Sequence, residues 1–484
     1  MTTQIESPFE DAWARVPPGT AMIPRRVERF DSVSKLLVAP IEYETVPFSV
    51  SDEKPSEAWV KSALSEFVCG SFGSGANRGP CPPRPRKWER FPATEEIPLS
   101  YVDELEGLIY RSKEYVDSVL SKSGPTMPER LLGLLGDSIF GNRKNFKNVE
   151  ASWFSQKVGP MIKEQLRLQF VLPAFPFKDQ SIFRTEAPPE HVDMGELAFM
   201  ARLHTLALAM YQVHPYGVDW ILVSDGIAYS RILRVDEAQV KGYFKRLVMF
   251  RNLMGLQRTI HIIDLDEMTH RLQSNAAGNC IFDVTKEAIK DILMKWESFQ
   301  NEQQDAMKVL VRGMKWNVNL KDITSAIDWE DLWLIMNSDS RDDLPLQLQR
   351  LWDDVTNVVT GAAIEYAAFN LTMKFHDVFA QLLPMPFRAT IHPKKGQIAV
   401  PHFGEVYPWN GVPLRHSEGA NARFESLPLY SLLKRSANPV VYTLEGSEVP
   451  FFYEIRGSPS TSGARANALD SEMSENERSQ RNLS

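Results

Sequence analysis

Charged side chains follow three apolar segments of the chain, at the points where those segments end. They are Lys178 after residues 168–172, Asp225 after 219–223, and Asp264 with Asp266 after 259–263. Parallel strands of an open α/β sheet end at one edge, and ligands bind there. A lysine and carboxylates that meet at such an edge can transfer protons and stabilise developing charge. The three together predict a shared pocket with exposed strand-end charges, although any one alone is better explained as an ordinary loop residue.

Cations and imidazoles concentrate in a second stretch, between residues 388 and 416. The set consists of Arg388, His392, Lys394, Lys395, His402, Arg415 and His416. Arginine and lysine pair strongly with phosphate oxygens, so the set is typical of a site for a phosphorylated substrate. A solvated hairpin tip explains Lys394 and Lys395 equally well. It is a weaker explanation for Arg388, His392 and Arg415, which lie among proline, tryptophan and aromatic residues.

The His-x-Asp pair formed by His191 and Asp193 offers an alternative chemistry. This spacing occurs in iron- and 2-oxoglutarate-dependent dioxygenases, and His402 or His416 could supply the distal third ligand. Asp193 also begins an Asp-x-x-Glu capping box with Glu196, which gives it a structural role at a helix start. We therefore expect no metal site.

A repeating pattern of strands and helices positions the three strand-end charges. The first apolar run is stopped by Pro173 and Pro176, which cannot donate ladder hydrogen bonds. A helix is predicted from Asp193, a second strand at 219–223, a helix from Asp236, and a third strand at 258–264. This order predicts an α/β fold with a Rossmann-like parallel sheet flanked by helices.

The remaining segments suggest four regions. Residues 1–124 form an N-terminal extension, with a helix at 58–68 and a Gly/Pro-rich loop at 69–90; residues 98–165 are expected to be helical. Residues 125–383 form the α/β core, including a helix-rich insertion at 285–380. Residues 384–456 form a β-containing region that completes the site, with hairpins expected at 387–400 and 439–455. Residues 457–484 have almost no large apolar side chains and predict a disordered tail.

The overall composition is that of a globular protein, with 43% hydrophobic and 24% charged residues. The net charge of −8 argues against a general nucleic-acid binder. No apolar run is long enough to cross a bilayer, and the N-terminus lacks the features of a secretory signal, so no membrane partner is expected. Cys69, Cys81 and Cys280 are too few and too scattered for a disulfide framework, which favours the cytoplasm. The sequence lacks a Gly-x-Ser-x-Gly hydrolase motif and a dinucleotide-binding glycine motif after a strand.

Several short motifs occur in an order that resembles a known family. They are Leu-Pro-Ala-Phe-Pro-Phe-Lys at 172–178, Val-Ser-Asp-Gly at 223–226, Val235-Asp236 with Tyr243, Arg312-Gly313, Ile391-His392-Pro393 and Pro408-Trp409-Asn410-Gly411-Val412. Over residues 125–455 this set resembles the isocyanide synthase family, also called the pyoverdine/dityrosine biosynthesis family. The chain departs from the family pattern at Asn410, where a histidine is expected.

The resemblance implies a reaction and a set of site residues. The α-amine of an amino acid, mostly tyrosine or tryptophan, condenses with ribulose 5-phosphate, and one sugar carbon remains on nitrogen as an isonitrile. No cofactor is implied beyond ribulose 5-phosphate as co-substrate. The expected catalytic residues are Lys178, Asp225 and His392. The expected substrate- and phosphate-binding residues are Arg388, Lys394, Lys395, Arg415, Ser224, Phe175, Phe177 and Trp409, although the aromatic residues could equally belong to the core.

Two further alternatives remain at this point. An enzyme of the same family could release an N-formyl amino acid for dityrosine or spore-wall biosynthesis. A protein with this fold could also bind small molecules without catalysis. The resemblance implies small-molecule substrates as partners, with a downstream oxygenase of the same pathway as a further partner.

Overall fold

The computed structural model describes most of the chain between residues 7 and 455. The described residues are 7–27, 29, 32, 42–51, 53–71, 79–85, 87–140, 151–272, 278–390, 396–416, 423–436 and 438–455. The predicted tail at 457–484 and the segment 72–78 of the predicted loop therefore lie outside the described residues. No helix in the described ranges is long and apolar enough to cross a membrane.

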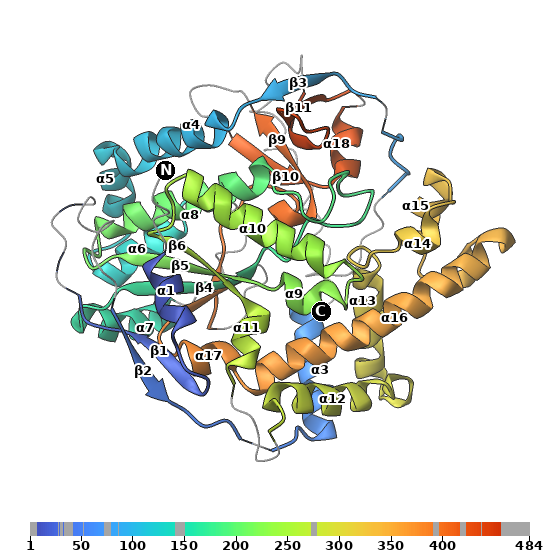
Figure 1. Ribbon diagram of the computed structural model, residues 1–484, viewed down its shortest axis with the longest axis horizontal. Coiled ribbons are helices and arrows are strands. Elements are labelled where there is room, and N and C mark those ends of the chain that lie inside the picture. Colours follow the sequence, from blue (N-terminus) through green and yellow to red (C-terminus); the bar gives the residue numbers. More distant parts are fainter. Residues whose placement is uncertain are drawn as a thin grey trace, which may run out of the picture.

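A five-stranded parallel sheet forms the centre of the molecule (Figure 1), in the order β6-β5-β4-β7-β8. The strands are β4 (Leu168–Ala174), β5 (Val218–Ser224), β6 (Ile260–Asp264), β7 (Phe387–Thr390) and β8 (Ile398–Ala399). Every residue of β5 is buried, as expected for a parallel strand covered on both faces. The predicted α/β fold and its first three strands are confirmed.

The connections after β4 and β5 explain how these strands end. β4 stops at Ala174, and Phe175 adopts a φ of 59° just before Pro176. α8 (Met194–Tyr211) then begins at the predicted capping box, because Asp193 and Glu196 each accept the other's backbone N–H. All of α8 is buried, and it packs on β5. α10 (Glu237–Leu253) is capped by Asp236, as predicted.

The hairpin predicted at 387–400 is wrong. β7 pairs with β4 and β8 pairs with β7, both in parallel, so the two strands extend the central sheet. Alternating burial places Phe387 and Ala389 inside, and the Phe387 ring stacks on Phe170 at 5.3 Å. A two-residue period identifies strands but not their direction, and the open edge of β4 supplies the partner here.

A second five-stranded sheet contains the other predicted hairpin and lies beside the first (Figure 1). Its order is β10-β9-β12-β11-β3. The antiparallel pairing of β11 (Val440–Leu444) with β12 (Pro450–Glu454) confirms the hairpin expected at 439–455. The other strands are β3 (Arg90–Ala93), β9 (Val412–His416) and β10 (Arg423–Leu427), followed by α18 (Leu429–Arg435).

Helices make up most of the remaining described chain. The helix predicted at 58–68 is confirmed, and the described parts of 98–165 are largely helical, whereas 141–150 lie outside the described residues. α3 (Glu57–Ser71) packs on α12, α13 and α16, at the lower right of Figure 1. The insertion comprises α12 (Ile281–Leu293), η3 (Trp296–Ser298), α13 (Asn301–Met314), α14 (Lys321–Thr324), α15 (Trp329–Asn337), η4 (Arg341–Asp343), α16 (Leu346–Phe375) and α17 (Val378–Leu382). The others are α1 (Pro8–Ala14), α4 (Glu96–Leu105), η1 (Glu106–Tyr110), α5 (Lys113–Lys122), α6 (Met127–Leu135), α7 (Ala151–Lys163), α9 (Gly226–Ser230), α11 (Leu265–His270) and η5 (Pro408–Asn410), with β1 (Thr20–Pro24) pairing β2 (Tyr43–Pro47).

Candidate active site

A cavity of about 950 Å³ lies at the carboxyl edge of the central sheet. Pro173 and Ala174 from β4, Asp225 after β5 and Thr390 from β7 form its floor. Side chains of α3, α9, α13, α15, α16 and η5 form its walls. This is the edge where the sequence placed a pocket, and it is large enough for two small substrates.

Asp225 is one of the carboxylates that line this cavity. It follows the last residue of β5, and Gly226 behind it leaves no space for a side chain, because a Cβ there would lie 1.9 Å from the carbonyl oxygen of Pro176. Oδ1 of Asp225 is buried and has no hydrogen-bond partner among the described residues. Burial, with a smaller contribution from the neighbouring Asp264 carboxylate, raises the pKa of Asp225 to about 7. Asp225 can therefore both accept and donate a proton near neutral pH.

Two phenols and an amide lie next to Asp225, and sequence reasoning missed all three. The hydroxyl of Tyr229 donates to Oδ1 of Asn370 at 3.1 Å, and the rings of Tyr229 and Tyr366 lie 5.1 Å apart. Burial and the Asp225 carboxylate raise the pKa of Tyr366, so its hydroxyl stays protonated and can donate a hydrogen bond. No local motif links these residues, because Tyr229 lies on α9 and the other two on α16.

Arg388 is a cavity cation without an ion pair among the described residues. Its guanidinium lies 5.0 Å from the centre of the Phe379 ring, and its buried Nε has no described hydrogen-bond partner. Burial lowers the pKa of Arg388, and Asp377 and Tyr229 offset part of this effect. A largely buried guanidinium that no described carboxylate pairs with favours binding of an anion.

The other cations of the cavity wall are already paired with carboxylates. The pairs are Arg184 with Asp179 at 2.6 Å, Arg312 with Asp339 at 2.7 Å, and Lys374 with Glu66 at 2.6 Å. A ligand would have to displace a carboxylate to reach any of them. Among the described residues, Arg388 is consequently the best candidate for binding an anionic group of a substrate.

Lys178 is fully buried and does not line the cavity, so its expected position as an exposed strand-end charge is wrong. Its Nζ lies 2.6 Å from Oδ2 of Asp193 and 2.8 Å from Oε1 of Glu196. It also donates to the carbonyl oxygen of Pro408 at 2.9 Å. Burial favours the neutral amine, but the two carboxylates outweigh this and raise the pKa of Lys178. The chain turns inward after Pro176, which the sequence does not reveal.

The contacts of Lys178 position a part of the cavity wall. The backbone N–H of the next residue, Asp179, donates to the carbonyl oxygen of Trp409 at 2.9 Å. Together the two hydrogen bonds hold η5 against the end of β4. Trp409 and Asn410 line the cavity.

The remaining predicted residues divide between the cavity and other places. Phe177 lines the cavity, whereas Phe175 packs behind Trp409 with ring centres 5.0 Å apart. Ser224 donates to the carbonyl oxygen of Phe175 at 3.0 Å. Arg415 lies in the second sheet, 3.4 Å from Glu454, and does not line the cavity. His392, Lys394 and Lys395 lie outside the described residues.

The residues of the His-x-Asp pair are committed to structural contacts. The His191 ring hydrogen-bonds the carbonyl oxygen of Pro450 at 2.9 Å, and burial lowers the pKa of His191 to about 4. Asp193 caps α8 and pairs with Lys178. His416 contacts Glu425 at 2.8 Å. Across the described ranges, no three His, Cys, Asp or Glu side chains are grouped to hold a metal ion.

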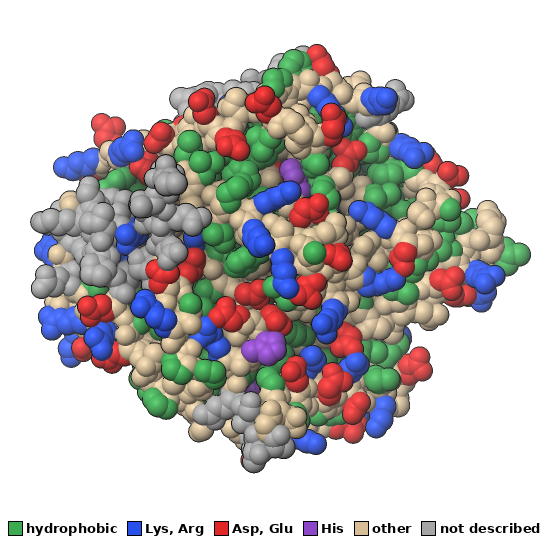
Figure 2. Space-filling model, in the orientation of Figure 1, with side chains coloured by type: hydrophobic (Ala, Val, Ile, Leu, Met, Phe, Trp, Pro, Cys, Tyr) green, Lys and Arg blue, Asp and Glu red, His purple; other side chains and the backbone are tan. Residues whose placement is uncertain are grey.

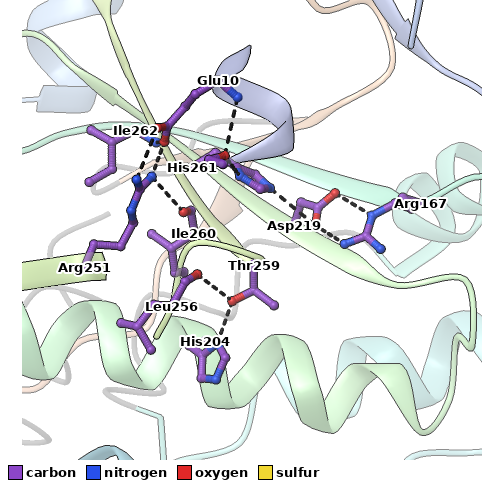
Figure 3. A network of polar contacts seen from close by, with 11 residues as sticks. Glu10, Arg167, His204, Asp219, Arg251, Leu256, Thr259, Ile260, His261 and Ile262 are labelled. Carbon is purple, nitrogen blue, oxygen red and sulfur yellow. Dashed lines mark hydrogen bonds and ion pairs between the residues drawn. The ribbon is translucent and has the colours of Figure 1, made fainter. Parts of the chain in front are cut away.

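A separate buried network lies near the opposite, amino ends of the strands (Figure 3). Arg167 pairs with Asp219, and His261 lies 3.5 Å from the same carboxylate. Ser7 contacts His261 at 2.7 Å, which assembles the residue types of a Ser-His-Asp triad. Ser7 is fully buried and also caps α1, so the arrangement has no access for a substrate. The Glu10 carboxylate accepts a hydrogen bond of 2.6 Å from the backbone N–H of Ile262 on the edge strand β6. The network thereby attaches α1 to the edge of the central sheet.

Charges of both signs are interspersed over the face of the molecule drawn in Figure 2. No broad patch of lysine and arginine side chains covers that face. Extended basic surfaces are typical of nucleic-acid binding. The visible face therefore lacks an extended basic surface of the kind that binds nucleic acids.

Comparisons with known proteins identify a matching family, a similar curated protein and a similar solved structure. Residues 158–422 match the model of a family described as pyoverdine/dityrosine biosynthesis protein. A stretch of 122 residues is 29% identical to the isocyanide synthase xanB of Aspergillus fumigatus; it covers 24% of this chain and only 15% of that relative. The crystal structure of PvcA from Pseudomonas aeruginosa covers 68% of this chain and 100% of its own, with a TM-score of 0.42 and 18% identity. The matched range 158–422 contains the whole central sheet, whereas α3 lies outside it.

Proposed function

Because the chain belongs to the pyoverdine/dityrosine biosynthesis family, we propose that it is an isocyanide synthase. In this proposal the α-amine of an amino acid such as tyrosine or tryptophan condenses with the ketone of ribulose 5-phosphate. Further proton transfers and carbon–carbon cleavage leave one sugar carbon on the nitrogen as an isonitrile. The product enters secondary metabolism.

The observation that carries the proposal is Asp225, a carboxylic acid with a pKa of about 7 that faces a cavity of two-substrate size. Imine formation requires a base that takes protons from the amine and an acid that returns them to the departing oxygen, which leaves as water. A single carboxyl group with a pKa near the working pH performs both steps well. Asp225 is the group assigned to these transfers.

Arg388, which lines the same cavity as Asp225, also supports the proposal. Both substrates carry an anion, the carboxylate of the amino acid and the phosphate of the sugar. The guanidinium of Arg388 is suited to a planar, bidentate hydrogen-bonded contact with either anion. Tyr229, Tyr366 and Asn370 line the same cavity, and in this proposal their polar groups lie beside the oxygens of the sugar.

The residues predicted around 392–395 remain proposed members of the phosphate site. His392, Lys394 and Lys395 follow β7, which brings Arg388 and Thr390 to the cavity. Lys178 and Arg415 have no part in the proposed chemistry, because neither lines the cavity. Lys178 instead positions Trp409 and Asn410 through the carbonyl of Pro408.

The test is incubation of the purified protein with ribulose 5-phosphate and each amino acid in turn, followed by mass spectrometry. We expect the isonitrile mass with at least one amino acid, and a loss of about a hundredfold or more in Asp225→Asn. Asp266→Asn is the matched control, because Asp266 is a partly exposed carboxylate beyond β6 that does not line the cavity.

Three other outcomes would contradict the proposal. An N-formyl amino acid as the product would identify the related activity of the family. Absence of any product would favour a binding protein. Full activity in Asp225→Asn would remove Asp225 from the proton transfers.

A further inference from the structure

One wall of the cavity comes from α3, which precedes the family-matched range 158–422. This helix contributes Glu66 and Phe67 to the lining. The rest of the site described above, from Asp225 to Arg388 and Asn410, lies within that range. α3 thus contributes to the cavity from outside the range that matches the family.

The position of α3 follows from its pattern of apolar residues. Val60, Leu64 and Val68 are buried and recur at helical spacing, so one face of the helix packs on α12, α13 and α16. The Trp59 ring contacts Phe375 edge to face at 5.0 Å, near the end of α16. Phe67 lies three residues after Leu64 and is therefore directed towards the same neighbours.

A row of aromatic rings connects Phe67 with the reacting region. The Phe67 ring lies 6.0 Å from the ring of Tyr366, which in turn lies 5.1 Å from that of Tyr229. Both tyrosines are close enough to Asp225 for its charge to raise their pKa values. A substrate amine at Asp225 therefore has an aromatic wall on the side that leads to α3.

We propose that Phe67 selects the amino acid substrate by forming, with Tyr366, the subsite for a large apolar or aromatic side chain. This inference depends on the proposed function. Arg388 binds an anionic group of the amino acid or the sugar. The side chain of the amino acid then packs along the rings of Tyr366 and Phe67. Ring-to-ring contact and burial of apolar area favour aromatic side chains there. Phe67 itself lies on a segment outside the family-matched range 158–422.

The test compares kcat/KM for tryptophan, tyrosine and valine in wild type and Phe67→Ala. We expect the ratio of the aromatic substrates to valine to fall about tenfold or more, mainly through KM, as for other losses of apolar contact in a binding pocket. Phe67→Trp fills the subsite and should shift preference towards valine. The two variants change the volume of the side chain in opposite directions and should both lower the ratio, so a loss of folding in one cannot account for both results.

Trp59→Ala is the structural control. It removes a contact between α3 and α16 but Trp59 does not line the cavity, so it should lower the Tm without changing the substrate ratio. A ratio within about twofold of wild type in both Phe67 variants would overturn the inference while leaving the proposed function intact. Calorimetric titration with the same amino acids measures the ratio of affinities even if no turnover occurs, and it separates failure of the subsite from failure of the chemistry.

Discussion

The Nζ of Lys178 donates a hydrogen bond of 2.9 Å to the carbonyl oxygen of Pro408, 230 residues later in the chain. The same ammonium contacts the carboxylates of Asp193 and Glu196, so its three N–H groups have three acceptors. This one side chain therefore joins the end of β4, the start of α8 and the η5 turn. Two of the residues of η5, Trp409 and Asn410, form part of the cavity wall.

Replacement of Lys178 should primarily destabilise the fold. Lys178→Met leaves two carboxylates buried without their cation, and loss of one partner from a buried ion pair costs about 3–5 kcal/mol. Urea denaturation measures the change in the free energy of unfolding. Lys163→Met, on an exposed lysine of α7, is the control and should change that free energy little. Normal stability combined with lost turnover would instead show that Lys178 takes part in the chemistry.

The ionisation of Asp225 should lower the stability of the protein as the pH rises. Because its pKa is about 7 in the folded state and near 4 in an unfolded chain, the folded state binds more protons between these values. Stability is then lost progressively between about pH 4 and 7. Asp225→Asn removes the titration and should raise Tm relative to wild type at pH 8, with little gain at pH 4. An equal difference at both pH values would mean that the carboxyl group titrates normally.

Arg388 should contribute to binding rather than to stability. Arg388→Met removes a hydrogen-bond donor to a charged group, worth about 1.5–3 kcal/mol, and should raise the KM of an anionic substrate by about tenfold or more. The Tm should not fall, because Arg388 has no ion pair among the described residues that its replacement would break. Arg415→Met is the control, since Arg415 lies outside the cavity. Unchanged KM values for both substrates would locate the anion site elsewhere.

The network of Figure 3 should matter for folding and not for turnover. Burial alone would raise the pKa of Asp219, but Arg167 and His261 lower it to about 2. The stabilisation is therefore present above about pH 4 and is lost as the pH falls towards 2. Asp219→Asn should cost about 3–5 kcal/mol at neutral pH while the folded fraction keeps its activity.

A double variant that removes both charges distinguishes the effect of an unpaired charge from damage to packing in that network. The double replacement Arg167→Met with Asp219→Leu removes both charges at similar volume, and it should recover much of the lost stability. A double variant as unstable as Asp219→Asn would contradict this account. A loss of turnover per folded molecule would connect the network to the cavity.

Local sequence patterns were sufficient to predict three of the strands of the central sheet, β4, β5 and β6. β4 and β5 are short apolar runs with a definite end, and Asp193 has its capping partner Glu196 three residues away. Asp225 was predictable for the same reason, because the strand that positions it immediately precedes it. Each of these signals lies within a few residues of the feature it predicts.

Other parts of the site depend on packing between distant segments. Tyr366 and Asn370 face the cavity only because α16 crosses it, and their spacing does not differ from that of other helical residues. Phe67 likewise reaches the cavity through the packing of α3. Lys178 has the surroundings of a loop residue in the sequence, and only the arrival of Glu196 and Pro408 makes it part of the interior.

The order of strands in the central sheet has a consequence for the way the chain folds during synthesis. β4 lies in the middle of the sheet, but its neighbour β7 begins only at Phe387, after the whole helical insertion has been made. Until then one edge of β4 has unpaired backbone groups beside apolar side chains such as Phe170, which is the kind of edge that recruits other chains. A nascent chain halted within the insertion would therefore be prone to aggregate, whereas one that extends past β8 can close the sheet.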